Sequence, residues 1–430
     1  MRIVHVYDGH EKVYRGRGSV PGVVWNVARE TAARGHDVTV LERRWEGLGE
    51  HATHEGVAFE RMSLRTGANE PWTRVPYEEV GSLGSALRLL GDRTNFAFRA
   101  LRRLRRLDPD VIHVHLPFAA NVIVTVAPWL RDRIVYTAHM GDLRMDLLED
   151  DSAVDVPGVL RLFSPDVYLA KRVAQTTVLN HEIHDAFVRG GVSPGRVEVV
   201  PNGVDLDRFG EVTEADLTRV REAYGLGDRP FVLYVGTVMP RKGVTELVRA
   251  LGSVAEREDV PTPRAILAGE NTLDEEYTAR VEGLIAELGL ERNVELMGFV
   301  DAADLPALYA LADAFVVSSL EEGFGMTAVE AMAAGTPVVG TQVGGIPTII
   351  EDGKQGRLVE PGDAAALADA LAEVLGDPEI RERMAEQARQ RARDFSWEAV
   401  GEQVEVVYHE VGASTPPERT FDAVETFPER

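Results

Sequence analysis

Two acidic side chains, Glu322 and Glu330, lie in and just after a glycine-rich turn that leads into a predicted helix. An apolar run at residues 314–317 precedes the turn and Gly335 ends the helical pattern, so the order is strand, turn, helix, strand. Such a turn lies at the carboxyl end of its strand, where open α/β sheets bind ligands, and the first helix amides face that place. Because Glu330 comes about two helical turns after Glu322, the stretch predicts a site for an extended, phosphorylated ligand such as a nucleotide sugar.

A lysine stands at a second turn of the same kind. Lys242 follows the predicted strand 231–235 and precedes the predicted helix 244–251. At such a place a cation can reach a diphosphate while the helix amides assist. Arg241 beside it can do the same or face solvent.

Histidines mark the end of two strands in the first half of the chain. His139 follows the strand 134–138 at the carboxyl end, where a doubly wound sheet places its site residues. The alternative for His139 is a capping or hydrogen-bonded loop histidine. His113 and His115 alternate with apolar residues, so they are expected to be buried strand histidines rather than ligands.

A long loop separates the first strand, residues 2–7, from the helix predicted at 23–34. A dinucleotide fold would place a tight GxGxxG motif there, with an acid such as Glu42 about 20 residues further on. The loop is too long for that motif, so we expect a flexible loop that closes over an acceptor. The residues assigned to this loop are Tyr14, Arg15, Arg17, Gly18 and Gly22.

Length and charge restrict the class of protein. A chain of 430 residues exceeds what one hydrophobic core usually serves, about 250–300 residues, so two domains are expected. The net charge of −24 argues against a nucleic-acid partner, which needs a basic surface. No apolar run reaches the roughly 20 residues that span a bilayer, and Met1 leads directly into a strand, which predicts a cytoplasmic protein. The chain has no cysteine, which excludes disulfides and thiolate metal sites.

One strongly basic island interrupts this acidic chain. The predicted helix 81–107 ends in RALRRLRRL, residues 99–107, with leucines on one stripe and arginines around it. The favoured interpretation is that the leucines pack on the sheet while the arginines are solvated. The alternative is peripheral contact of the basic segment 99–106 with an anionic membrane, at the cytoplasmic face.

Two doubly wound α/β runs follow one another along the chain. Predicted strands alternate with helices up to the turn PNGVD at 201–205, which marks a boundary, and a second alternation begins at residue 231. From 363 to 411 the pattern is helical. The tail from 413 has little apolar periodicity and is expected to be disordered or loosely docked.

These residues resemble the retaining GT-B glycosyltransferases of the large fourth sequence family, the glycosyl transferases group 1. The likeness extends along the chain to about residue 411. Its landmarks, in chain order, are ARGHDVTV, DPDVIHVH, the strand that ends at His139, VVPNGVDLDRF, YVGTVMPRKGV, MGFV, EEGFGMTAVEAMAAGTPVV, GGIPTIIEDGKQGRLVEPGD and FSWEAV. One such motif alone is weak evidence, whereas the ordered set is strong.

The resemblance implies an α/β fold of GT-B architecture, with two Rossmann-like domains that face each other across a cleft. It places an acceptor domain at 1–204, a donor-nucleotide domain at 205–395, a helix at 396–412 that crosses back to the first domain, and a tail at 413–430. It also implies a nucleotide-sugar co-substrate, a glycan or lipid-linked glycan acceptor, no cofactor and no metal.

The resemblance implies a role for each site residue. Glu322 would contact donor-sugar hydroxyls, Glu330 the ribose hydroxyls, and Lys242 the leaving diphosphate. His139 would project towards the donor sugar and the acceptor. The other donor-binding residues are Arg241, Phe299 and Val300, whose main chain would bracket the base, and Gly323, Phe324, Gly325 and Met326, whose amides would hold sugar and diphosphate.

Retention is expected without a covalent intermediate, because no second acid is evident where double displacement would need one. Two positions depart from the family pattern: Thr237 stands where many members have arginine, and Thr348 where glutamate is frequent. The alternatives are a sugar-nucleotide epimerase or a phosphorylase on the same fold, or a non-catalytic nucleotide-sugar binding protein.

Overall fold

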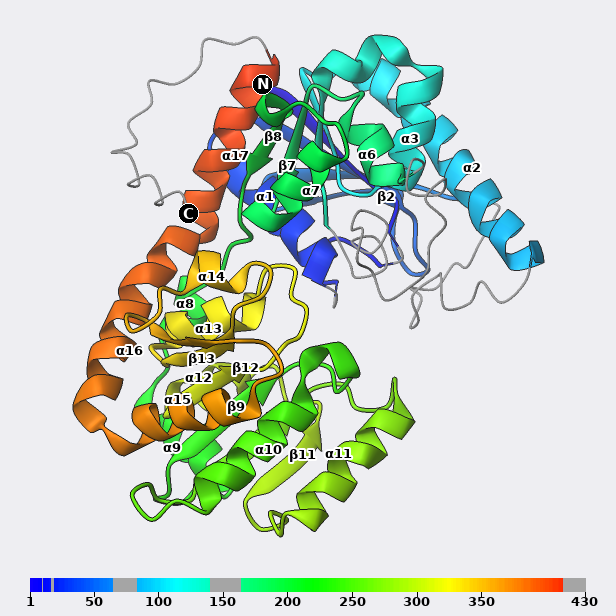
Figure 1. Cartoon of the computed structure of the whole chain (residues 1–430). Helices are drawn as coiled ribbons and strands as arrows, with labels where there is room; N and C mark the ends of the chain where they lie inside the picture. Colours follow the sequence, from blue (N-terminus) through cyan, green and yellow to red (C-terminus); the bar gives the residue numbers. More distant parts are fainter. Residues whose placement is uncertain (10, 17–18, 65–82, 140–163, 413–430) are drawn as a thin grey trace.

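The structure, a computed structural model, describes residues 1–9, 11–16, 19–64, 83–139 and 164–412. Within these ranges the chain forms two α/β units, one above the other in Figure 1, each with helices packed around a central sheet. The central strands are buried along their whole length, as expected for parallel strands covered by helices on both faces.

The first unit is built on an eight-stranded sheet in the order β3-β4-β2-β1-β5-β6-β7-β8. Its strands are β1 (Arg2–Tyr7), β2 (Asp37–Arg43), β3 (His51–His54), β4 (Val57–Met62), β5 (Val111–Val114), β6 (Ile134–Thr137), β7 (Gln175–Val178) and β8 (Val197–Val199). All pairs are parallel except β3 with β4. Neither β3 nor β4 was predicted from the sequence. The strand β3 is a short, half-exposed edge strand without an apolar run.

The helices of the first unit cover both faces of this sheet. They are α1 (Ser19–Ala33), α2 (Leu83–Leu107), α3 (Pro117–Val126), η1 (Pro128–Arg133), α6 (Pro165–Ala170), α7 (His181–Arg189) and η2 (Pro194–Arg196). In α2, Leu101 and Leu104 are buried while Arg102, Arg105 and Arg106 are exposed, so the predicted packing of the leucines is confirmed.

The second unit is built on a six-stranded parallel sheet in the order β11-β10-β9-β12-β13-β14. Its strands are β9 (Phe231–Val235), β10 (Arg264–Ala268), β11 (Val294–Gly298), β12 (Ala314–Val317), β13 (Val338–Thr341) and β14 (Gly356–Val359). Its helices are α8 (Leu206–Gly210), α9 (Glu214–Ala223), η3 (Pro240–Lys242), α10 (Val244–Ala255), α11 (Glu275–Glu287), α12 (Leu305–Leu311), α13 (Met326–Ala334), α14 (Ile346–Ile349), α15 (Ala364–Gly376) and α16 (Pro378–Ala392).

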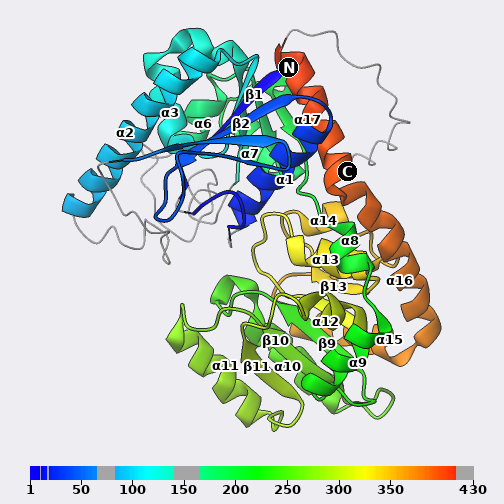
Figure 2. The ribbon, with the colours of Figure 1, turned by 180° about the vertical axis from the view of Figure 1, so that it is seen from behind.

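The last helix connects the two units. After η4 (Arg393–Phe395) the chain enters α17 (Trp397–Gly412), which packs on α1, β5 and β6 of the first unit, so that α16 and α17 form one edge of the molecule (Figure 2). The Val204 amide donates to the Phe395 carbonyl at 2.7 Å, and a Cβ on Gly203 would lie 2.5 Å from the Trp397 ring. This close contact requires glycine at position 203.

Candidate active site

The glycine-rich turn forms as predicted between β12 and α13. Its last residue, Gly325, is the N-cap of α13 and has a left-handed φ of 101°, and no side chain caps the helix. A Cβ at Gly325 would lie 2.4 Å from Ile346 Cδ1, so only glycine fits. Gly335 ends the helix in the same left-handed region. The uncapped N-terminus leaves the first amides of α13 to bind a ligand.

Lys242 and Glu322 form an ion pair at the mouth of this turn. Lys242 Nζ lies 2.6 Å from Glu322 Oε2, and each side chain is only 15% exposed. Ser319 Oγ donates to the same carboxylate oxygen at 3.1 Å. The structure therefore brings together two residues that lie 80 positions apart in the sequence.

The turn that carries Lys242 is held rigidly against the end of β12. The Arg241 carbonyl accepts from the Leu320 amide at 2.7 Å, and Ser318 Oγ donates to the Lys242 carbonyl at 2.9 Å. Gly243 has a φ of 59°, and a Cβ there would lie 1.9 Å from the Ser318 carbonyl oxygen. Both charged side chains therefore project from one preorganised backbone unit.

The glycines of the GGIP segment pack directly on the glycine-rich turn. A Cβ on Gly344, whose φ is 52°, would lie 1.6 Å from the Glu322 carbonyl oxygen. A Cβ on Gly345 would lie 2.5 Å from the Phe324 carbonyl oxygen. The motif thus acts as a backbone support that fixes the conformation of the turn.

Glu330 lies about one turn into α13, since the helix begins only at Met326. Its Oε2 accepts from the Tyr309 hydroxyl at 2.8 Å. Part of the side chain is exposed, yet burial of the carboxyl raises its pKa to about 7, against the opposing effects of the Tyr309 hydrogen bond and the Arg208 charge. Tyr309 was not predicted as a site residue, because it lies in an apolar helix, α12, that looks like core.

Asn180 links the first unit to the glycine-rich turn. Its Oδ1 accepts from the Ile183 amide and caps α7, while its Nδ2 donates to the Gly323 carbonyl at 2.6 Å. Asn180 was also missed, although an asparagine between a strand and a helix is a typical N-cap signal. Because it follows β7, its contact shows that the carboxyl ends of both sheets meet at this turn.

His139 lies at the neighbouring strand end. It follows β6, whose Thr137 is the register partner of Thr177 in β7, so it ends next to the segment that carries Asn180. The side chain is 8% exposed, and its Nε2 lies 3.2 Å from His115 Nδ1. His139 is therefore a hydrogen-bonded loop histidine. That hydrogen bond is compatible with the role at the donor sugar and acceptor that the resemblance implies.

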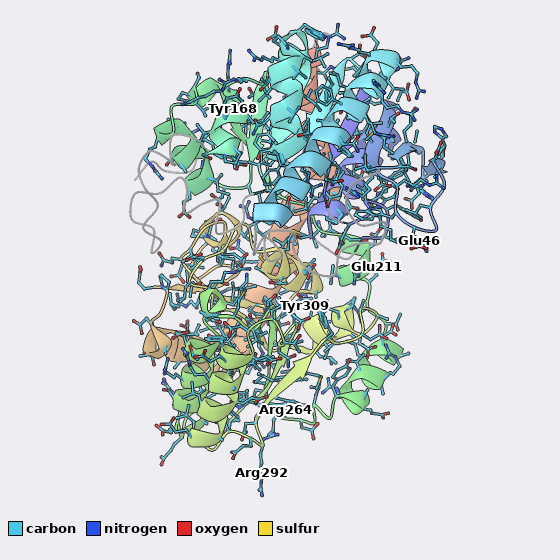
Figure 3. The ribbon with its side chains drawn as sticks, turned by 90° about the vertical axis from the view of Figure 1, so that its right-hand side faces the viewer. Glu46, Tyr168, Glu211, Arg264, Arg292 and Tyr309 are labelled. Carbon is cyan, nitrogen blue, oxygen red and sulfur yellow. The ribbon has the colours of Figure 1, made fainter. Side chains whose placement is uncertain are left out.

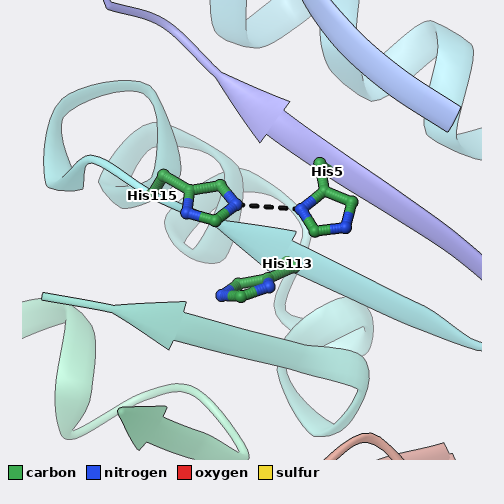
Figure 4. A group of neighbouring side chains, drawn as sticks. All are labelled: His5, His113 and His115. Carbon is green, nitrogen blue, oxygen red and sulfur yellow. Dashed lines mark hydrogen bonds between the residues drawn. The ribbon is translucent and has the colours of Figure 1, made fainter. Parts of the chain in front are cut away.

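His113 in β5 and His115 just after it are buried, as their alternation with apolar residues predicted, and His5 in β1 is buried beside them (Figure 4). His5 Nδ1 lies 2.9 Å from His115 Nε2. His113 Nδ1 lies 2.6 Å from the Tyr408 hydroxyl, and His113 Nε2 lies 2.6 Å from Thr137 Oγ1. Burial lowers the pKa of His5 to about 3 and holds the pKa values of His113 and His115 well below the usual value, so all three are neutral at pH 7.

The three histidines of Figure 4 come close enough together to be considered as metal ligands. Each offers a nitrogen within 4.8 Å of the others. Both ring nitrogens of His113, however, are hydrogen-bonded to hydroxyl groups, and His5 and His115 bond to each other. The geometry is that of a hydrogen-bonded cluster, and a metal would have to break these bonds.

The acceptor loop differs from the expectation in two ways. Gly22 does not belong to it, because α1 begins at Ser19; a proline is tolerated in the first helical turn, so Pro21 does not delay the helix. Tyr14 is stacked on His54, with ring centroids 4.0 Å apart, and Arg15 lies over the Tyr14 ring. Arg17 and Gly18 lie outside the described residues.

A buried carboxylate, that of Glu42, also holds the same loop. The Val13 amide donates to Glu42 Oε2 at 2.8 Å, and Glu42 also accepts from Arg61 Nε at 2.7 Å. Glu42, the acid that a dinucleotide site would use, is therefore a buried support for the loop. Residues 13–15 of the loop that we expected to be flexible are held in this structure by the stacking of Tyr14 and by Glu42.

Phe299 and Val300 lie apart from the Lys242–Glu322 pair. They follow β11, which is three strand positions from β12 in the sheet order, roughly 14 Å along the sheet edge. Phe299 is 77% exposed, and Val300 packs against the core.

Comparison with known proteins gives the family. The model of Glycosyltransferase Family 4 matches residues 21–208, and that of Glycosyl transferases group 1 matches residues 218–391. A D-inositol 3-phosphate glycosyltransferase of Corynebacterium jeikeium is 33% identical over 416 residues, 92% of this chain and 93% of that protein. A protein of the same name from Actinosynnema mirum is 33% identical over 339 residues, 74% and 78% of the two chains. The chain belongs to the glycosyl transferases group 1 family.

Solved structures confirm the GT-B architecture. Sucrose-phosphate synthase from Thermosynechococcus elongatus superposes with a TM-score of 0.77 at 24% identity, over 96% of this chain and all of that one. HepE from Anabaena, crystallised with UDP-glucose, superposes with a TM-score of 0.69 at 22% identity, over 94% and 98% of the two chains. The predicted pair of doubly wound units is therefore correct.

Proposed function

We propose that the protein transfers a sugar from a nucleotide diphosphate sugar to a hydroxyl acceptor with retention of configuration, in the cytoplasm. The observation that carries this proposal is the Lys242–Glu322 pair beside the uncapped N-terminus of α13. A cation, helix amides and a carboxylate converge there at the carboxyl end of a parallel sheet. These are the groups that a diphosphate and a sugar require.

The nucleotide-sugar donor can be placed in one orientation along the carboxyl edge of the second sheet. The base would bind at Phe299 and Val300, the diphosphate near Lys242 and Arg241, and the sugar against Glu322 and the amides of residues 323–326. The separation of roughly 14 Å between β11 and β12 suits an extended nucleotide sugar. Glu330 would accept hydrogen bonds from the ribose hydroxyls.

Negative charge builds on the leaving diphosphate as the glycosidic bond breaks. A cation and dipoles fixed before the reaction stabilise that charge more in the transition state than in the ground state. We propose that the diphosphate oxygen takes the acceptor proton on the same face of the sugar. Glu322 is engaged through Oε2 by Lys242 and Ser319, which supports a binding role for it rather than attack on the sugar.

The expected acceptor is a glycan or a lipid-linked glycan. The names of the bacterial relatives add D-inositol 3-phosphate as an acceptor to test. A sugar-nucleotide epimerase would need neither acceptor, and a phosphorylase would need inorganic phosphate or a sugar 1-phosphate in place of the nucleotide sugar.

Product analysis tests the proposal. With a panel of UDP-, GDP- and ADP-sugars and these acceptors, we expect one donor to give an α-linked product from an α-linked donor, and we expect EDTA to leave the rate within about twofold. A donor at about 100 times its Kd should stabilise the fold by about 2.7 kcal/mol in a thermal shift. An acceptor-independent C2 epimer, inversion, or a glycosyl adduct on Glu322 would contradict the proposal.

A membrane contact through α2 has support from exposed side chains of the first unit. Large apolar residues are exposed on α2, α3 and η1: Leu90, Phe98, Phe118, Val126 and Trp129. The helices α2 and α3, drawn in cyan, face the viewer in Figure 3. Arg105 lies over the Trp129 ring, and Arg102, three residues earlier in α2, is exposed. Among the described residues no helix is long and apolar enough to cross a membrane. We therefore propose peripheral binding to an anionic lipid surface, such as the cytoplasmic face of the membrane.

Vesicle flotation checks this contact. We expect the protein to float with vesicles that contain phosphatidylglycerol and not with phosphatidylcholine alone. The double substitution F98S and W129S should weaken the binding roughly 10-fold or more through lost apolar burial. Leu273, which is 58% exposed on the second unit, offers the matched control L273S. Equal vesicle binding by F98S/W129S and L273S would show that the exposed apolar residues of α2 and η1 do not contact the membrane.

A further inference from the structure

We propose that His115 and His5 are positioning residues that hold the ring of His139 and place its proton on Nδ1. The inference rests on the proposed function, in which His139 faces the donor sugar and acceptor. It adds two residues that lie behind His139 and touch neither substrate.

The three rings form one hydrogen-bonded chain. His139 Nε2 lies 3.2 Å from His115 Nδ1, and His115 Nε2 lies 2.9 Å from His5 Nδ1. His115 follows β5 two residues after His113, the register partner of His5 in β1, so the side chains share one face of the sheet. The chain therefore runs from β1 across the end of β5 to the loop after β6, as its first two members show in Figure 4.

Burial fixes the direction in which hydrogen bonds are donated along these three rings. His5 and His115 are 0% exposed and remain neutral, so each ring carries a single N–H. His5 Nε2 is buried without a hydrogen-bond partner. An orphaned buried N–H is less tolerable than an orphaned lone pair, so the proton of His5 belongs on Nδ1 and is donated to His115 Nε2. His115 then donates from Nδ1 to His139 Nε2, which leaves the His139 proton on Nδ1.

The consequence for the reaction is preorganisation. A histidine that accepts a hydrogen bond at Nε2 keeps one ring orientation and one tautomer. Its Nδ1 then carries the proton and can act only as a hydrogen-bond donor.

His113 supplies the matched control. It is as buried as His115 and lies on the same strand face, but its hydrogen bonds go to Tyr408 and Thr137 instead of His139. A substitution there disturbs the packing of α17 without breaking the chain to His139.

Steady-state kinetics test the chain. We expect His115→Leu to lower kcat about 10- to 100-fold with little change in donor KM. His115→Asn, whose amide nitrogen replaces Nδ1, should recover most of kcat. His113→Leu should lower Tm at least as much as His115→Leu while keeping kcat. The double variant H115L/H139A should be no slower than H139A, since a positioning residue acts only through the residue that it positions.

The outcomes separate the two proposals. If H139A itself keeps full kcat, the assigned role of His139 is wrong; if H139A loses kcat and H115L does not, only the positioning role is wrong. Nitrogen-15 NMR of labelled histidines gives an independent check that requires no variant. A His139 ring protonated on Nδ1 agrees with the chain, and one protonated on Nε2 overturns it, also where H115L does not fold.

Discussion

Replacing Lys242 with alanine is expected to lower kcat about 100- to 1000-fold, the range for loss of one preorganised charge-stabilising group. Lys242 is the cation paired with Glu322 at the donor turn, at 2.6 Å and mostly shielded from water. In the proposed reaction its charge would act on a leaving diphosphate whose negative charge grows in the transition state, so kcat should fall more than donor affinity. Single-turnover and steady-state rates with the accepted donor measure the effect.

Two controls separate chemistry from folding. Lys354→Ala removes a lysine that is 58% exposed and pairs with Glu351 in the same unit, and it should leave kcat within about twofold. K242A also leaves Glu322 without its cation, which destabilises the fold, whereas K242A/E322Q removes the unpaired charge. The double variant should therefore regain Tm and stay inactive. A K242A enzyme with kcat within threefold of the wild type would remove the cation from the mechanism.

The strand, glycine-rich turn and helix that carry Glu322 and Glu330 could be predicted because their signals are local. The apolar run of β12, the glycines at 323 and 325, and the helical spacing up to Gly335 lie within one short stretch, and each has a direct backbone consequence. The resemblance to a known family then gave Glu330 and Lys242 their expected roles at the ribose and the diphosphate.

What could not be predicted depends on contacts between distant segments. The Lys242–Glu322 ion pair, the Asn180–Gly323 hydrogen bond and the support of the acceptor loop by Glu42 each join different strands. Sequence spacing carries no information on such pairs. The loop was expected to be flexible because its glycines were visible, whereas the stacking of Tyr14 on His54 was not. The edge strand β3 was missed for a related reason, since half-exposed strands lack a continuous apolar run.

Glu330 should make donor binding depend on pH near neutrality. Its pKa is raised to about 7, so the carboxyl gains a proton as pH falls through that value. A protonated carboxyl accepts ribose hydroxyls less well, because hydrogen bonds to a charged acceptor are worth about 1.5–3 kcal/mol. We expect the donor KM of the wild type to rise roughly 10-fold from pH 8 to pH 5.5. Glu330→Gln should have the high KM at both pH values.

The same substitution should stabilise the fold at high pH. Between the ordinary pKa of 4.5 and the raised value of about 7, the folded state binds more protons than the unfolded state. Stability from this group is therefore highest at low pH and falls as pH rises through that window. Glutamine resembles the neutral carboxyl, so E330Q should gain about 1–3 kcal/mol in free energy of unfolding at pH 8 and almost nothing at pH 4.5.

Tyr309→Phe provides the control that links the two effects to one carboxyl. The Tyr309 hydroxyl donates to Glu330 and opposes the rise in its pKa, so its removal should shift the pH midpoint of donor KM upwards. Denaturant unfolding at both pH values and KM profiles of the three proteins measure the set. A wild-type KM that stays flat from pH 8 to pH 5.5, although E330Q gains stability at pH 8, would show that Glu330 titrates near neutrality without binding the ribose.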